Sequence, residues 1–195
     1  MTPPPVLLLP GWSDDARRLR WLRSFLVEAG WPEARVEIVE RASRFGSSVE
    51  HAERIDAAAT RLLAATGEPA VDVVAHSMGG LAARWWLAGA GADKARKVIF
   101  LATPHRGTWA AWLAWGAGGR ELRPGSELLR RLAAAPVPPA VRLHTIRTRR
   151  DLRIFPPSSA TLPGAEDIVL WMPTHPGLIR SRAVFDRVRR ILLDP

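Results

Sequence analysis

Short runs of β-branched and aliphatic residues alternate with longer amphipathic runs along the whole chain. This alternation is typical of an α/β fold with a parallel sheet and helices on both faces. We therefore expect a single domain over residues 1–195, built on about six mostly parallel strands. The expected strands are Val6–Leu9, Val36–Glu40, Val71–Ala75, Val98–Leu101, Val141–Thr148 and Ile168–Trp171.

Three amphipathic segments predict helices that cover this sheet. Apolar side chains recur at helical spacing within residues 19–29, 55–63 and 184–192. We expect Ser13 to cap the start of the first helix and Gly30 to end it. Ser47 and Glu50 form a capping-box pattern that opens the second helix.

The composition excludes a disordered chain and a membrane span. Hydrophobic residues make up 47% of the chain and charged residues 24%, and no apolar run approaches the ~20 residues that cross a bilayer. The absence of cysteine excludes disulfides, thiolate catalysis and cysteine-bound metals. Residues 1–9 hold neither a basic segment nor an apolar run of signal-peptide length, so we expect a cytoplasmic protein.

The formal net charge of +9 comes almost entirely from arginine, because Lys94 and Lys97 are the only lysines. Such a charge could attract nucleic acid or an anionic membrane surface. The arginines are scattered, however, and form no compact basic motif interleaved with aromatic residues. We therefore expect solvated surface charge, no nucleic-acid partner and no stable membrane insertion, and the oligomeric state stays open.

Residues 71–84 carry the clearest chemical signal. A β-branched strand ends abruptly at Ser77, and a helical pattern begins at once. In such a strand–turn–helix the serine adopts a strained backbone and points from the sheet edge, and the residues two before and two after it must be small. Ala75 and Gly79 meet that condition, so Ser77 is the candidate nucleophile; the alternative is a serine that only caps the helix.

A serine nucleophile needs a histidine base from a later loop. His51 lies on an expected helix, His76 inside the turn, and His144 in an expected strand. His105 follows the fourth strand and is expected to support its loop. His175 follows the last strand and is therefore the candidate base.

The base needs an acid that orients it. Asp151 lies in the loop after the fifth expected strand, whereas the loop after the fourth has no carboxylate near it. We therefore expect Asp151 to be the acid, with Glu166 and Asp167 as alternatives.

Two backbone N–H groups should bind the oxyanion. Met78, directly after the serine, is expected to supply one. The loop after the first strand should supply the other, from Trp12 or, as the alternative, Gly11.

With these residues, the chain resembles the small bacterial lipases and esterases of the α/β-hydrolase superfamily. The resemblance is carried by Leu8–Trp12, Ala75–Gly80, Thr103–Thr108, Asp151 and His175. It implies a minimal version of the fold, without additional antiparallel edge strands. It also implies hydrolysis of a small-molecule ester or lipid through an acyl-enzyme, without a metal or organic cofactor.

The candidate substrate-binding residues are Gly11, His76, Trp109 and Trp112. Trp109, Trp112 and Trp115 share one face at helical spacing, which favours either an acyl pocket, a lipid-binding face or packing on the sheet. Residues 108–139 are the candidate cap. Thioesterase, amidase and acyltransferase activities remain alternatives on the same scaffold, and so does a non-catalytic basic binding protein.

Overall fold

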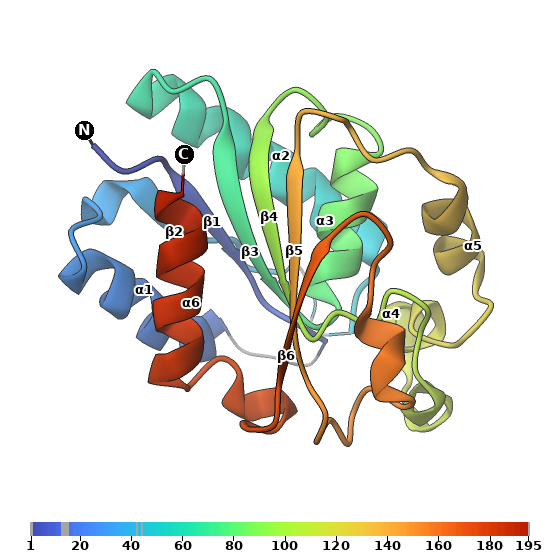
Figure 1. Ribbon diagram of the computed structural model, residues 1–195. Coiled ribbons are helices and arrows are strands. Elements are labelled where there is room, and N and C mark those ends of the chain that lie inside the picture. Colours follow the sequence, from blue (N-terminus) through green and yellow to red (C-terminus); the bar gives the residue numbers. More distant parts are fainter. Residues whose placement is uncertain (1, 13–15, 42, 44, 195) are drawn as a thin grey trace.

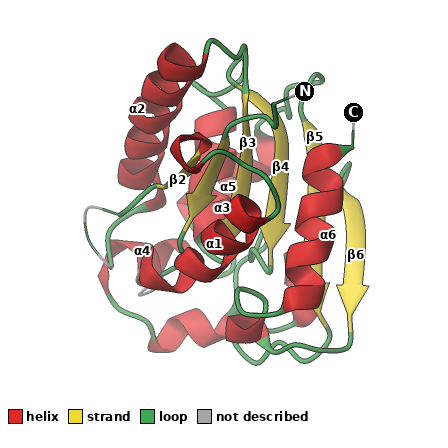
Figure 2. Ribbon diagram, turned by 90° about the vertical axis from the view of Figure 1, so that its left-hand side faces the viewer, coloured by secondary structure: helices red, strands yellow, loops and turns green. Residues whose placement is uncertain are grey.

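The computed structural model describes residues 2–12, 16–41, 43 and 45–194. Within these residues, six strands form one sheet in the order β2-β1-β3-β4-β5-β6, and every neighbouring pair is parallel. Figure 2 shows the strands running in one common direction. The expected strands and their parallel arrangement are confirmed. Their bounds are Val6–Leu9 (β1), Val36–Ile38 (β2), Val71–His76 (β3), Ala95–Leu101 (β4), Arg142–Thr148 (β5) and Glu166–Leu170 (β6).

Helices cover both faces of the sheet, as expected for this fold class. In Figure 1, α1 and α6 lie on one side of the strands, and α2 and α3 lie on the other. None of the described helices is long and apolar enough to cross a lipid bilayer. The α-helix bounds are Arg20–Glu28 (α1), Ser48–Thr66 (α2), Gly79–Leu87 (α3), Gly116–Glu121 (α4), Glu127–Ala134 (α5) and Arg182–Leu193 (α6).

Side-chain alternation along the central strands produces two separate core layers. Leu7 and Leu9 pack with α2 and α3, whereas Val6 and Leu8 pack with α1 and α6. All four side chains are fully buried. A strand that is covered on both faces reads as a continuous apolar run, which is why the sequence pattern locates β1 so closely.

The predicted helix caps are present where the structure describes them. The Ser47 hydroxyl accepts the Glu50 N–H at the start of α2, and Gly67 ends that helix in the left-handed conformation. Gly30, with φ of 105°, follows α1. Ser13, the expected cap of the first helix, lies outside the described residues, and α1 itself begins at Arg20.

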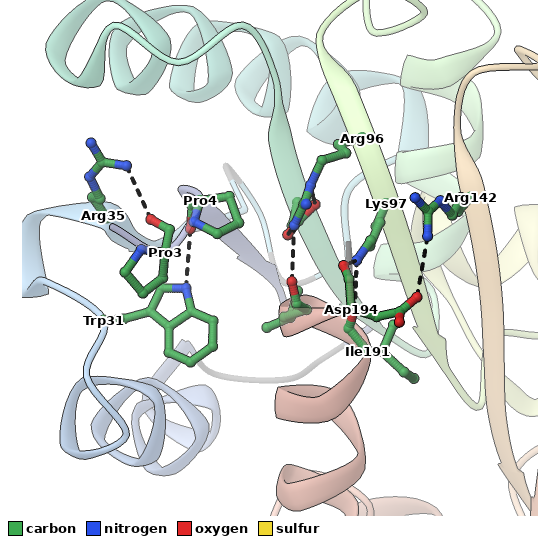
Figure 3. Close-up of polar contacts among 11 residues, drawn as sticks. Pro3, Pro4, Trp31, Arg35, Arg96, Lys97, Arg142, Ile191 and Asp194 are labelled. Atoms are coloured by element: carbon green, nitrogen blue, oxygen red, sulfur yellow. Dashed lines mark hydrogen bonds and ion pairs between the residues drawn. The ribbon is translucent and has the colours of Figure 1, made fainter. Parts of the chain in front are cut away.

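Charged side chains at the amino edge of the sheet hold the end of α6 (Figure 3). The Arg96 guanidinium donates two bonds to the buried Asp72 carboxylate and a third to the Leu192 carbonyl. The fully buried Lys97 donates to the carbonyls of Ile191 and Asp194. These cations satisfy carbonyls at the helix terminus, where the backbone dipole favours positive charge.

Candidate active site

Ser77 occupies the turn between β3 and α3, at the carboxyl edge of the sheet. Its φ of 53° lies in the left-handed region, where a side chain strains the backbone. The Ser77 N–H donates to the Leu101 carbonyl of β4 at 2.8 Å, and the Ser77 carbonyl accepts the Gly80 N–H at 3.0 Å. Bonds on both sides therefore hold the strained turn, and the predicted strand–turn–helix around Ser77 is confirmed.

The start of α3 approaches the backbone after β1 so closely that only small residues fit. A Cβ atom at Gly79 would lie 2.6 Å from the Pro10 carbonyl oxygen and 2.8 Å from that of Leu9. A Cβ atom at Gly80 would collide with the Thr103 side chain. Ala75 is fully buried. The size restriction expected from the sequence thus has a specific cause, the contact between α3 and the β1 loop.

His175 begins a 3₁₀ turn, η5 (His175–Gly177), between β6 and α6. Its side chain is buried, and its Nδ1 lies 2.8 Å from Asp151 Oδ2. Because a carboxylate oxygen accepts, the Nδ1–H donates, and Nε2 is the nitrogen left to accept another proton. Ser77 and His175 line the same cavity.

Asp151 is held by its own loop as well as by the histidine. Its Oδ1 accepts the N–H groups of Arg153 at 2.9 Å and Ile154 at 2.8 Å, while Oδ2 faces His175. The carboxylate is therefore fixed at both oxygens and orients the imidazole.

Neither alternative acid lies near His175. Asp167 accepts bonds from the Thr145 hydroxyl and the Arg147 guanidinium, and Glu166 lies 3.0 Å from His144 Nδ1. Both residues begin β6 and so lie at the amino end of the strand, whereas His175 follows its carboxyl end. The structure brings Asp151 to His175.

His76, which was expected to contact substrate, is not among the residues that line the cavity. Its ring lies 4.8 Å from the His175 ring, and its Nε2–H donates to the His175 carbonyl at 3.4 Å. Side chains alternate along β3, so His76 shares the face of Val74, which packs with α1 and α6. His76 therefore supports the histidine loop from behind, outside the lining of the cavity.

Burial lowers the pKa of His175 below its ordinary value. The Asp151 hydrogen bond opposes this effect, while the charges of His76 and Arg153 add to it. A lowered pKa keeps the imidazole neutral, the form that accepts a proton, to lower pH. The other buried histidine of a loop, His105, packs edge-on against Phe100, and burial holds its pKa well below the ordinary value.

A cavity of about 300 Å³ opens beside Ser77 and His175. Most of its lining comes from the start of the expected cap and from the Asp151 loop. The lining is mainly apolar, which suits an acyl or other apolar group. Besides Ser77 and His175, it consists of Trp12, Thr108, Ala110, Ala111, Leu113, Ala114, Leu122, Leu152, Arg153 and Ile154.

Trp109, Trp112 and Gly11 are not among the residues that line this cavity, and their contact with substrate stays a prediction. Trp109 and Trp112 lie on a 3₁₀ helix, η3 (Trp109–Leu113), and are 64% and 61% exposed. Residues three apart eclipse one another on such a helix, so both indoles point outward while Ala111 turns inward. Their exposure also excludes the alternative that these tryptophans pack on the sheet. Gly11 is buried, directly before Trp12.

The two segments expected to supply the oxyanion hole lie side by side. Met78 directly follows Ser77, and the Gly79 contact with the Leu9 and Pro10 carbonyls brings the loop after β1 against this turn. Trp12 lines the cavity, and its ring packs 5.2 Å from that of Phe45.

Solved structures match this architecture over nearly the whole chain. The mature lipase BlEst2 of Bacillus licheniformis has a TM-score of 0.81 at 16% identity, covering 98% of this chain and 92% of the lipase. A bromoperoxidase from Bacillus anthracis has a TM-score of 0.70 at 16% identity, with the same coverage of both chains. The protein has the α/β-hydrolase fold.

A larger protein also matches the fold of this chain. Lipase B of Aspergillus fumigatus has a TM-score of 0.76 at 21% identity, covering 91% of this chain. This chain spans 49% of that lipase. No protein-family model matches the sequence.

Sequence reasoning missed the role of one residue that organises this candidate site. The Thr108 hydroxyl donates to the Arg153 carbonyl at 2.8 Å and accepts the Phe155 N–H at 2.9 Å. It therefore ties the Asp151 loop to the opposite wall of the cavity. Its position after Gly107 was the only local signal, because its partners are more than 40 residues away in the chain.

Proposed function

We propose that this α/β-hydrolase is a serine hydrolase that cleaves carboxylic esters through Ser77, His175 and Asp151. The observation that carries the proposal is the cavity shared by a strained serine and a histidine whose Nδ1 lies 2.8 Å from Asp151. A strained serine at a strand–helix turn, a neutral histidine and an orienting carboxylate form the group set of serine acyl transfer.

In the proposed first step, the Ser77 hydroxyl attacks the ester carbonyl and its proton passes to His175 Nε2. The backbone N–H groups of Met78 and Trp12 stabilise the negative charge on the carbonyl oxygen. Asp151 stabilises the imidazolium without taking its proton. The C–O bond then breaks, His175 returns the proton to the leaving alcohol, and Ser77 carries the acyl group.

In the second step, water replaces the alcohol. His175 removes a proton from the water as it attacks the acyl carbonyl, and the Ser77 oxygen leaves with that proton. The carboxylic acid and free Ser77 result. The same residues serve both halves of the reaction, because in each half an O–H group attacks the carbonyl and His175 accepts and then returns a proton.

The cavity supports an ester with an apolar acyl group of short or medium length. Its volume of about 300 Å³ is at the small end of ligand pockets, and alanine and leucine side chains form most of its walls. The similarity to two lipases agrees with an ester or lipid substrate. The bromoperoxidase shows that the fold also carries other chemistry, so the assignment depends on the site.

A fluorophosphonate probe tests the proposal directly. We expect covalent labelling of Ser77, identified by mass spectrometry of the modified peptide, and loss of both labelling and ester hydrolysis in a folded Ser77→Ala protein. Labelling at another residue, or full turnover by Ser77→Ala, would refute the assignment.

The substrate class requires a second experiment. Matched nitrophenyl esters, acyl thioesters and anilides with the same acyl groups should show the highest kcat/KM for the esters. A preference for thioesters or amides would keep Ser77 as nucleophile but replace esterase with thioesterase or amidase. A protein that neither reacts with the probe nor turns over any substrate would be a non-catalytic binding protein.

A further inference from the structure

Exposed apolar side chains gather around the mouth of the cavity. Among the described residues, eight of the twelve large hydrophobic side chains that are exposed lie in three segments, 109–115, 152–155 and 171–172. The segments follow β4, β5 and β6, so all three lie at the carboxyl edge, the lower side of Figure 1. The eight are Trp109, Trp112, Leu113, Trp115, Leu152, Phe155, Trp171 and Met172, which we call the mouth surface.

The mouth surface adjoins the cavity and is continuous with it. Leu113 and Leu152 are 86% and 88% exposed, yet both line the cavity, so they mark two sides of its opening. Trp109 and Phe155 are adjacent, because the Trp109 N–H donates to the Phe155 carbonyl at 3.0 Å. Contiguous exposed apolar groups of this kind mark an interaction site.

Arginines are interleaved with these apolar side chains. The Arg123 guanidinium lies 4.9 Å from the Trp112 ring centre, and that of Arg149 lies 5.1 Å from the Trp171 ring centre. Arg150 lies 3.6 Å from the Met172 sulfur. Indole rings and arginine side chains each have an apolar part and a polar end. They therefore suit the boundary between lipid headgroups and acyl chains.

The charge of the same segments is one-sided. Residues 106–124, 149–155 and 171–176 contain six arginines and two carboxylates. Both carboxylates are engaged inward, Asp151 on His175 and Glu121 on the Ser48 N–H. No further carboxylate within these segments offsets the six arginines, and the whole chain has a net charge of +9. This charge is complementary to an anionic surface.

We propose that the mouth surface docks the protein on an anionic lipid bilayer, with the cavity facing the lipid. The tryptophans and leucines enter the headgroup region and the arginines contact lipid phosphates. The inference deepens the proposed function, on which it rests for its consequence that ester substrates enter from the lipid. The docking itself requires no catalysis, so it is measured on a protein that cannot turn over.

The test uses the full chain carrying Ser77→Ala and sedimentation with vesicles. We expect binding to vesicles of phosphatidylcholine and phosphatidylglycerol in equal parts, weakened by added salt, and little binding to phosphatidylcholine alone. Trp112→Ser and Leu113→Ser should each weaken partitioning about tenfold, because each removes a large apolar group from the lipid. Arg149→Gln and Arg150→Gln should each weaken it about fivefold.

Matched controls lie away from the mouth surface. Leu193→Ser changes an exposed leucine at the end of α6, beside the opposite edge of the sheet, and Arg187→Gln removes an exposed charge on the same helix. Both should bind vesicles like the parent protein. All these side chains are exposed, and matched melting temperatures check that the variants are folded.

Four outcomes would overturn the proposal. The protein could bind neutral vesicles as strongly as anionic ones, or Leu193→Ser could weaken vesicle binding as much as Leu113→Ser does. Duplex DNA or heparin could abolish vesicle binding while Trp112→Ser has no effect on it, or the protein could bind no vesicles and instead form a dimer that Leu113→Ser dissociates. Failure of docking leaves probe labelling of Ser77 in the wild-type protein unaffected. The failure of the lipid proposal is therefore distinguishable from failure of the proposed esterase activity.

Discussion

The chemistry of the site depends on how individual side chains are held. Ser77 is strained, Asp151 is fixed by two backbone N–H groups, and His175 is buried between the Asp151 carboxylate and the His76 ring. Each constraint limits a residue to one orientation, and that preorganisation makes substitutions of single atoms informative.

Asp151→Asn should lower turnover by as much as ~10⁴-fold, because an asparagine in this position favours the wrong imidazole tautomer. Asp167→Asn is the matched control, since this carboxylate is bound to Thr145 and Arg147 at the amino end of β6. Ester hydrolysis by both variants is measured at several salt concentrations and with melting temperatures matched. Activity that is retained in Asp151→Asn but lost in Asp167→Asn would show that Asp151 is not the acid.

The pH dependence of kcat/KM should follow the neutral form of His175. The ordinary histidine pKa is about 6.5, and burial lowers that of His175. Protonation at low pH removes the base, so activity should rise with pH, and the midpoint should lie below the ordinary value. A profile with its midpoint above about 6.5, in the absence of a rate-limiting step other than chemistry, would contradict this assignment.

At the scale of secondary-structure elements, the contact between the start of α3 and the loop after β1 fixes the position of the Ser77 turn. This contact requires a residue without a side chain, because a Cβ at Gly79 would collide with the Leu9 and Pro10 carbonyls. Trp12, in the loop after β1, lines the same cavity as Ser77, so the start of α3, the turn and this loop depend on one another.

Gly79→Ala should lower the free energy of unfolding by about 1–3 kcal/mol and reduce probe labelling of Ser77, because the new methyl group forces the turn away from the β1 loop. Gly89→Ala is the matched control, since a Cβ there would meet only carbonyl oxygens at 4.0 Å. Urea denaturation and labelling of the folded proteins measure both effects. If the two variants behave alike, the close approach of α3 to the loop after β1 does not hold the turn at Ser77.

At the scale of the whole molecule, the two edges of the sheet have different roles. The carboxyl edge holds Ser77, the cavity and the mouth surface, whereas the amino edge holds the Asp72, Arg96 and Lys97 cluster that anchors α6 (Figure 3). Burial raises the pKa of Asp72, and its bonds to Arg96 oppose that effect. The anchor therefore depends on the pairing of a buried carboxylate.

Arg96→Met should lower the free energy of unfolding by about 3 kcal/mol, because the Asp72 carboxylate stays buried without its partner. Arg61→Met, which breaks an exposed pair with Glu37, should change it by less than about 1 kcal/mol. Well below the melting temperature, probe labelling of Arg96→Met should equal that of the wild type, since the cluster lies at the opposite edge. Equal stability of the two variants would show that the buried pair does not anchor the fold.

The local features of this protein were determined by its sequence. Strand periodicity, the predicted helix ends at Ser47 and Gly30, and the small residues around Ser77 depend on sterics within a few residues of one another, so their pattern is visible along the chain. The parallel sheet follows from the alternation of strands and helices. The placement of Ser77, Asp151 and His175 at one edge of the sheet could likewise be predicted, because the loops after parallel strands converge there.

Only the tertiary structure decided the choices between residues that are far apart in sequence. The sequence favoured Asp151 and left Glu166 and Asp167 as alternatives, and only the position of each relative to the two ends of its strand determined which one meets His175. The same holds for His76, which packs on the base, and for Trp109 and Trp112, which face outward. Their environments depend on the packing of segments separated by tens of residues, and neither propensity nor periodicity contains that distance information.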